Sequence, residues 1–314
     1  MVADGGIVAV RIADSDDLEV FERSPQDPHH RSRPIQTRDV RAPVEEGIEL
    51  AGKLFEPADA PKRAILINGA TGTPQSFYED FAAWLADSQG ALVLTYDYRD
   101  SGLSKTGHLR GAKATMSDWG IADQAGALEF LSYRHPKLPI SVIGHSLGGM
   151  FFAFHPNASR IERAIVIGAG PAYWLEHPLT FMPQILAFWW LVAPLATAAL
   201  GYMPGKTLGL GSDLPKGVYW QWRRWCLTRQ FYRIDYGRDL PEPDPSRLTC
   251  PVRIIGIADD VMITPATAER MADFYPHAEI EHRLVSPNDI GGNAIGHLGL
   301  FKQRNAALWP RLVD

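Results

Sequence analysis

Cysteine is scarce in this sequence: Cys226 and Cys250 are the only two in 314 residues. They do not form the closely paired spacing of a metal site, and nothing in the pattern supports a disulfide between them. We therefore expect free thiols, as in a reducing compartment, and a cytoplasmic location.

An excess of positive charge is also absent, because 31 Lys and Arg face 36 Asp and Glu, giving a net charge of −5. This balance gives no electrostatic reason to expect binding to nucleic acid or to an anionic membrane. The first ten residues include Asp4 and lack a basic start followed by an apolar core, so they do not predict a signal peptide. Residues 1–34 are polar and predict a mobile N-terminal tail, with one short strand at 7–12.

Beyond the tail, the sequence alternates between short apolar runs and segments with helical spacing. Hydrophobic residues make up 46% of the chain and charged residues 21%, enough apolar residues for a large core. A hairpin is expected at 36–44 and 48–55. Further strands are expected at 63–68, 91–95, 140–145, 164–167, 251–257 and 279–284, and helices at 74–88, 117–133, 265–275 and 298–312, with Ser117 as an N-cap. This order predicts an α/β fold with a mostly parallel sheet covered by helices on both faces.

The alternation stops between residues 171 and 248, which are rich in Trp, Tyr, Pro and Gly. We predict a core of residues 35–170 and 249–314, interrupted by a helical cap (lid) insertion at 171–248. Residues 178–205 carry no charge and could span a bilayer by length, but Pro183 and Pro194 interrupt them and no Lys/Arg cluster flanks them. A pair of cap helices over a pocket is the favoured interpretation, and membrane contact is the less favoured one.

The sequence Gly144-His145-Ser146-Leu147-Gly148 fits the pattern G-x-S-x-G and follows an apolar strand. In this pattern the serine lies at a sharp turn from strand to helix, and the glycines leave room for the chain to fold back. Residues 150–155 are compatible with the helix that should follow. A serine hydroxyl becomes nucleophilic when a histidine takes its proton and an acid orients that histidine.

His297 lies in a glycine-rich loop just before the last predicted helix, where such a base is expected, whereas His277 and His282 adjoin or occupy a strand. Asp259 and Asp260 both follow the strand at 251–257, and we prefer Asp260 as the acid. The oxyanion needs two backbone N–H donors. Leu147 should supply one, and the loop at 68–72 the other, with Ala70 preferred to Thr71.

With these residues in place, the sequence resembles the α/β-hydrolase superfamily, over residues 35–309. More narrowly it resembles a bacterial "predicted α/β hydrolase" family related to serine aminopeptidase-like and monoacylglycerol-lipase-like domains. The matching blocks are 68–75, 94–99, 118–119, 144–149, 201–206, 221–225, 259–260 and 295–301. Asp100 departs from the pattern, since such loops usually carry glycine there. The resemblance implies Ser146, Asp260 and His297 as a catalytic triad.

The sequence therefore predicts a serine hydrolase, without cofactor or metal, that cleaves a carboxylic ester or related acyl compound through an acyl-enzyme on Ser146. The aromatic cap favours an apolar or aromatic acyl substrate. The alternatives are an acyltransferase that uses the same acyl-enzyme and a ligand-binding protein of this fold without turnover.

Overall fold

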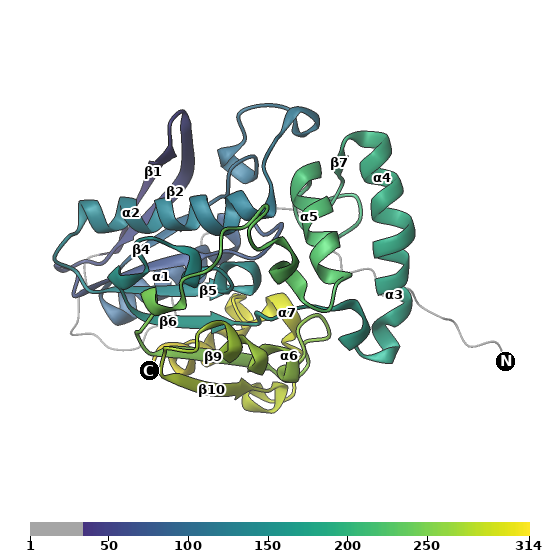
Figure 1. Cartoon of the computed structure of the whole chain (residues 1–314). Coiled ribbons are helices and arrows are strands. Elements are labelled where there is room, and N and C mark those ends of the chain that lie inside the picture. Colours follow the sequence, from purple (N-terminus) through teal and green to yellow (C-terminus); the bar gives the residue numbers. More distant parts are fainter. Residues whose placement is uncertain (1–33) are drawn as a thin grey trace.

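The computed structural model describes residues 34–314. The predicted N-terminal tail and its strand at 7–12 therefore lie outside the described residues. An eight-stranded sheet with the order β1-β2-β4-β3-β5-β6-β9-β10 forms the centre (Figure 1). Strands β1 (Gln36–Glu45) and β2 (Ile48–Glu56) form the expected hairpin, and β2 lies antiparallel to β4.

The other six strands are parallel to one another, as predicted. They are β3 (Arg63–Asn68), β4 (Ala91–Tyr96), β5 (Ile140–His145), β6 (Ile161–Ile167), β9 (Val252–Ile257) and β10 (Ile280–Val285). Successive side chains of a strand point to opposite faces. Leu66 and Val142 accordingly belong to one apolar core, and Ile67 and Ile143 belong to the other. The sheet is thus buried on both faces, as expected of a parallel sheet.

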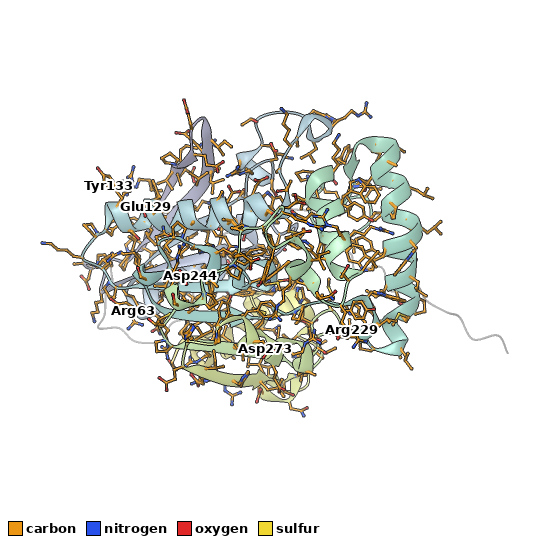
Figure 2. All side chains as sticks on the ribbon, viewed as in Figure 1. Arg63, Glu129, Tyr133, Arg229, Asp244 and Asp273 are labelled. Atoms are coloured by element: carbon orange, nitrogen blue, oxygen red, sulfur yellow. The ribbon has the colours of Figure 1, made fainter. Side chains whose placement is uncertain are left out.

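Helices cover these two faces. Helix α2 (Gln124–Arg134) continues from a π-helical turn at Asp118–Asp123 and packs into the first core, with Tyr133 and Glu129 projecting from it (Figure 2). Helices α1 (Glu79–Gln89) and α8 (Trp309–Val313) pack into the second core. Helix α6 (Pro265–Glu269) follows β9, and α7 (Gly296–Gly299) carries His297.

Three local predictions were wrong. Ser117 is not an N-cap: the helix begins at Met116, and the Thr115 hydroxyl accepts from the Asp118 N–H, while the Asp118 carboxylate accepts from Thr115. Residues 150–155 form a short 3₁₀ turn at Phe152–Phe154 rather than a helix. Their environment explains this, because the Met150 carbonyl accepts from the Tyr232 hydroxyl and the Ala153 carbonyl from the Asp244 N–H.

The predicted last helix at 298–312 is divided into α7, a 3₁₀ turn at Gln303–Leu308 and α8. The side chain of Asn305 donates to the Gly299 carbonyl at 2.8 Å, which ends α7 by occupying an acceptor that a continuing helix would need.

Between β6 and β9 the chain forms α3 (Met182–Leu186), α4 (Ala193–Leu200) and α5 (Lys216–Cys226), with a small ribbon of β7 (Tyr202–Met203) and β8 (Leu214–Pro215). In Figure 1 these helices (green) lie together beside the end of the sheet toward which the arrows of β6 and β10 point. A π-helical turn, Ala187–Val192, joins α3 to α4. It precedes Pro194, whose ring excludes a regular helical hydrogen bond.

Helical turns thus run without interruption from Leu179 to Leu200. This helix is long and apolar enough to cross a membrane, and only 17% of its most apolar window is buried. Its buried side chains form one narrow stripe of Ile185, Trp189, Ala193 and Thr197. The face opposite this stripe, including Trp190 and Leu195, is exposed.

Candidate active site

Ser146 lies at the carboxyl end of β5, and its backbone has φ of 53°, one of three positive values among the non-glycine residues of the described chain. An L-residue with a positive φ is strained and needs surroundings that enforce it. The two motif glycines supply the room for this turn. A Cβ on Gly148 would lie 2.1 Å from the Asn68 carbonyl oxygen, and one on Gly144 would lie 2.4 Å from the Gly148 oxygen.

His297 and Asp260 are joined by a hydrogen bond of 2.7 Å between Nδ1 and Oδ2. Asp260 is buried, and its other oxygen, Oδ1, accepts from the Met262 and Ile263 amides at 2.8 and 3.0 Å. Because a carboxylate only accepts, His297 carries its proton on Nδ1 and leaves Nε2 as an acceptor. The carboxylate therefore fixes both the tautomer and the orientation of the ring.

Asp259 has a different partner. Its two carboxylate oxygens accept from the Ile295 and Gly296 amides at 2.8 and 2.9 Å, immediately before His297. Gly296 has φ of 59°, a conformation that glycine adopts without strain. The two neighbouring aspartates thus act on the same histidine in different ways: Asp260 contacts its ring and Asp259 holds its loop.

The strand order brings Ser146, Asp260 and His297 to the same end of the sheet, because β5, β6 and β9 are parallel neighbours whose carboxyl ends lie side by side. Gly168, just after β6, lies between them. A Cβ added to Gly168 would lie 3.6 Å from both Asp260 Oδ2 and His297 Nδ1. His145, the residue before Ser146, donates from Nε2 to the His297 carbonyl at 3.0 Å, so the histidine loop is attached directly to the turn that carries Ser146.

The two backbone amides predicted as oxyanion donors, those of Leu147 and Ala70, differ in whether they already have an acceptor. Leu147 is the second residue of the 3₁₀ turn Ser146–Gly149, and the first N–H groups of such a turn have no acceptor within it. The Ala70 amide, which was the preferred second donor, is already bound: it donates to the Tyr78 hydroxyl at 2.9 Å. That preference is therefore wrong for this conformation. Within residues 34–314 the neighbouring Thr71 amide donates no hydrogen bond.

Tyr78 and His145 are site residues that the sequence did not reveal. The Tyr78 hydroxyl lies 2.8 Å from His145 Nδ1, and both side chains are almost completely buried. Burial lowers the pKa of His145 well below its usual range, with a further contribution from His297. The sequence contains one indication of such a role: the unspecified position before the serine in G-x-S-x-G is occupied by His145, which has two hydrogen-bonding nitrogens.

The other candidates lie elsewhere. His277 and His282 are exposed, and His282 lies on β10 at the edge of the sheet. Asp100, which departs from the family pattern, has φ of 58° and accepts from the Lys113 and Ala114 amides at 3.2 Å. Its carboxylate thereby holds the loop that leads to the helix beginning at Met116.

Several residues of the segment between β6 and β9 contact the loops of the site. The Ser212 N–H donates to the Gly72 carbonyl in the loop after β3 at 2.7 Å. His177 and Glu176 contact the region after β9. His177 Nδ1 donates to the Val261 carbonyl at 3.1 Å, next to Asp260, and burial lowers the pKa of its ring. Glu176 forms an ion pair with Arg270 at 2.7 Å. These contacts place the beginning of the long helix at the edge of the Asp260 loop.

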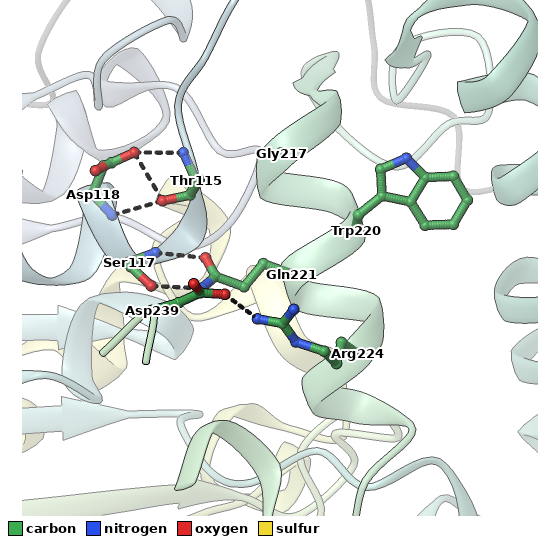
Figure 3. Close-up of a pocket in the computed structure, with 8 residues that line it drawn as sticks. All are labelled: Thr115, Ser117, Asp118, Gly217, Trp220, Gln221, Arg224 and Asp239. Carbon is green, nitrogen blue, oxygen red and sulfur yellow. Dashed lines mark hydrogen bonds and ion pairs between the residues drawn. The ribbon is translucent and has the colours of Figure 1, made fainter. Parts of the chain in front are cut away.

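A shallow cavity of about 340 Å³ lies between α5 and the residues around Met116, apart from these groups (Figure 3). Its polar lining is paired internally: Gln221 bonds with Ser117, and Arg224 contacts Asp239. Within the described residues, no group of three or more His, Cys, Asp or Glu side chains could hold a metal ion.

Residues 59–211 match the family described as serine aminopeptidase, S33. No curated protein matches the sequence. Among solved structures, an esterase from Pyrococcus furiosus is similar at 16% identity, with a TM-score of 0.56, over 88% of this chain and 89% of that chain. An enol-lactonase from Burkholderia xenovorans is similar at 19% identity, with a TM-score of 0.54, over 88% and 98% of the two chains.

An acylaminoacyl peptidase from Pyrococcus horikoshii shares 13% identity with a TM-score of 0.53, over 89% of this chain and 40% of that one. At such identities the structural likeness establishes the fold. The structural likeness and the sheet topology together show the α/β-hydrolase fold, and the match of residues 59–211 to a serine aminopeptidase family supports an α/β-hydrolase family for this chain.

Proposed function

We propose that the chain is a serine hydrolase that cleaves carboxylic esters through an acyl-enzyme on Ser146. The observation that carries this proposal is the 2.7 Å bond between Asp260 and His297, attached through His145 to the strained turn at Ser146. Nucleophile, base and orienting acid are the three roles that acyl transfer by serine requires.

In the proposed reaction His297 Nε2 accepts the Ser146 proton as the serine oxygen attacks the ester carbonyl. The imidazolium that forms is stabilised by Asp260, which stays ionised. Collapse of the tetrahedral intermediate expels the alcohol, which takes the proton from His297. Water, deprotonated by the same ring, then attacks the acyl-enzyme. The second tetrahedral intermediate releases the acid as Ser146 Oγ leaves and takes the proton back from His297.

The negative oxygen of each tetrahedral intermediate needs N–H donors that are already in place. We propose the amides of Leu147 and Thr71. Leu147 directly follows the nucleophile, and Thr71 follows Ala70, whose amide is turned toward Tyr78. Removing one such donor typically costs about 100- to 1,000-fold in kcat.

We propose that residues 171–248 act as a cap that gives the site its preference for apolar acyl groups. His177 and Glu176 anchor the start of this segment beside Asp260, and its aromatic side chains pack extensively: Trp189 lies 4.9 Å from Trp222 and 6.2 Å from Tyr219, measured between ring centroids. In this proposal the apolar part of the cap lies over the polar reaction centre, an arrangement that suits a substrate with one apolar and one polar end.

The test is turnover of p-nitrophenyl esters of increasing chain length by the wild-type chain and by Ser146→Ala. We expect the variant to lose turnover by several orders of magnitude, and a fluorophosphonate to label Ser146 in the wild type only. Labelling without turnover would support an acyltransferase, to be detected by adding a competing alcohol or amine. An unlabelled Ser146 would favour a binding protein instead.

A second proposed property is contact with a lipid surface through the helix Leu179–Leu200. Its outward face carries Leu186, Trp190, Leu191 and Leu195, which are 44%, 45%, 58% and 63% exposed, and no charged residue. Exposed apolar patches of this kind mark interaction sites, and a helix of this composition can lie within a bilayer interface.

Co-flotation with phosphatidylcholine liposomes tests this property. We expect the wild-type chain to float and the double variant Leu191→Glu with Leu195→Glu to stay in the soluble fraction. The matched control is Tyr133→Glu, which adds a charge at a residue that is 84% exposed on α2. A wild-type chain that stays wholly soluble would exclude the lipid contact but leave the hydrolase proposal intact.

A further inference from the structure

A buried chain of hydrogen bonds links four segments of the site. Ala70 N–H lies 2.9 Å from the Tyr78 hydroxyl, which lies 2.8 Å from His145 Nδ1, and His145 Nε2 lies 3.0 Å from the His297 carbonyl oxygen. The linked groups come from the loop after β3, the residue immediately before α1, the end of β5 and the start of α7.

Elementary chemistry fixes the direction of every bond in this chain. The His297 carbonyl can only accept, so His145 must carry its proton on Nε2, and its Nδ1 is then an acceptor. The Tyr78 hydroxyl therefore donates to Nδ1, and its oxygen accepts from Ala70. The chain has one consistent polarity, with every donor and acceptor satisfied.

Packing holds these groups rigidly. Tyr78, His145 and Phe301 are at most 1% exposed, and their rings contact one another with centroids 4.7 to 5.9 Å apart. The lowered pKa of His145 keeps its ring neutral, which the polarity of the chain requires. A buried and fully satisfied polar network of this kind specifies a single arrangement of the groups it joins.

We propose that Tyr78 and His145 are positioning residues that hold the general base and the oxyanion loop in register around Ser146. At one end the network fixes the backbone of His297 and thereby the origin of its side chain. At the other end it fixes the Ala70 peptide and thereby the direction of the next amide, that of Thr71. This inference rests on the proposed hydrolase function and assigns a role to the residue that precedes the nucleophile.

Two substitutions of His145 separate its two bonds. The glutamine amide nitrogen can occupy the position of Nε2, so His145→Gln retains a donor for the His297 carbonyl. The asparagine side chain reaches only the position of Nδ1, so His145→Asn retains a partner for Tyr78 and leaves the His297 carbonyl unpaired. Tyr78→Phe keeps the aromatic packing and removes the hydroxyl that serves both Ala70 and His145.

We expect Tyr78→Phe and His145→Asn each to lower kcat for p-nitrophenyl butyrate by roughly 10- to 100-fold, the usual cost of leaving buried partners unpaired. KM should change by less than about threefold, because the loss falls on the geometry of the reacting groups. His145→Gln should recover a substantial part of the loss seen in His145→Asn. Rates are expressed per active site, titrated with a fluorophosphonate, so that unfolded protein does not count.

A purely structural role would lower the melting temperature and leave kcat per titrated site unchanged, and that result would overturn the inference. Equal kcat for His145→Gln and His145→Asn would overturn the role of the His297 bond. Should the His145 variants fail to fold, Tyr78→Phe decides alone. A wild-type chain with neither turnover nor labelling would overturn the hydrolase function and, with it, this inference.

Discussion

Replacing Asp260 with asparagine is the sharpest test of the site, because the structure determines how the new amide would sit. Oδ1 of Asp260 faces two backbone N–H groups, those of Met262 and Ile263. The amide oxygen must take that position, since an NH₂ group there would meet two donors. The NH₂ group then faces His297 Nδ1, where Oδ2 now lies at 2.7 Å.

An amide donor at this position reverses the histidine tautomer. His297 must now accept at Nδ1 and carry its proton on Nε2, the nitrogen that should receive the Ser146 proton. The same exchange in the general serine-protease mechanism lowers kcat about 10⁴-fold, which corresponds to about 5.5 kcal/mol in activation free energy. We expect a similar loss here with little change in melting temperature, because both backbone bonds to Oδ1 remain.

Asp259→Asn provides the matched comparison one residue away. Its new NH₂ group would face either the Ile295 or the Gly296 amide, so one of the two backbone bonds is lost and two donors meet. The penalty of about 1–3 kcal/mol for a donor left without an acceptor predicts a loss of roughly 5- to 100-fold in kcat. This loss should be clearly smaller than that of Asp260→Asn.

Both variants are assayed for kcat and KM on the same p-nitrophenyl ester, with the active sites titrated. A larger loss for Asp259→Asn than for Asp260→Asn would refute the assignment of roles. So would an Asp260→Asn protein that keeps more than about a tenth of wild-type kcat, since a histidine locked in the wrong tautomer cannot serve as the base.

Two further predictions concern the turn at Ser146 and the stability of the fold. Gly148→Ala should give an inactive or insoluble protein, because its Cβ would lie 2.1 Å from the Asn68 carbonyl oxygen, whereas Gly107→Ala, with open space around it, should express normally; an active Gly148→Ala enzyme would contradict the tight turn. Burial lowers the pKa of His155 from 6.5 to about 4. Folding therefore favours the neutral His155 ring. The free energy of unfolding carries the full contribution of this ring above pH 6.5, and it falls by roughly 3 kcal/mol as the pH drops to 4. His155→Gln, whose amide can still donate to the Gly120 carbonyl as His155 Nε2 does, should flatten this part of the acid sensitivity in urea unfolding at different pH values; an unchanged pH dependence would contradict it.

The central strands β3, β4, β5 and β9 were predictable because each is a short apolar run buried on both faces, and this pattern depends on local sequence alone. The boundaries of the helices were less predictable from the sequence. The spacing of apolar residues at 298–312 fits one helix, but Asn305 captures the Gly299 carbonyl and divides it. At Thr115–Asp118 a capping box overrides the simpler choice of Ser117, whose N–H donates to Gln221 of α5 instead. Specific side-chain hydrogen bonds, which the spacing of apolar residues does not show, decided these boundaries.

The same limit applies to the site. Ser146 and His297 could be proposed as nucleophile and base because a sharp turn and a glycine-rich loop have recognisable sequence patterns. Consecutive aspartates have no such pattern, because their side chains diverge once the strand ends and only the backbone path decides which one faces the ring. Asp260 was preferred from the expected length of the strand, and its hydrogen bond with His297 fits that preference.

The oxyanion loop shows why a motif alone does not identify its donors. Successive amides of a turn point in different directions, so Ala70 and Thr71 are equivalent in sequence, but the Ala70 amide is bound to Tyr78 and only that of Thr71 is proposed as a donor. The Tyr78 hydroxyl, eight residues later, selects between them by accepting from Ala70. That hydroxyl is itself oriented by His145, whose tautomer is set by the carbonyl of His297. The choice of donor at one end of the site therefore depends on the position of the base at the other, and this dependence is a physical reason for a histidine immediately before Ser146.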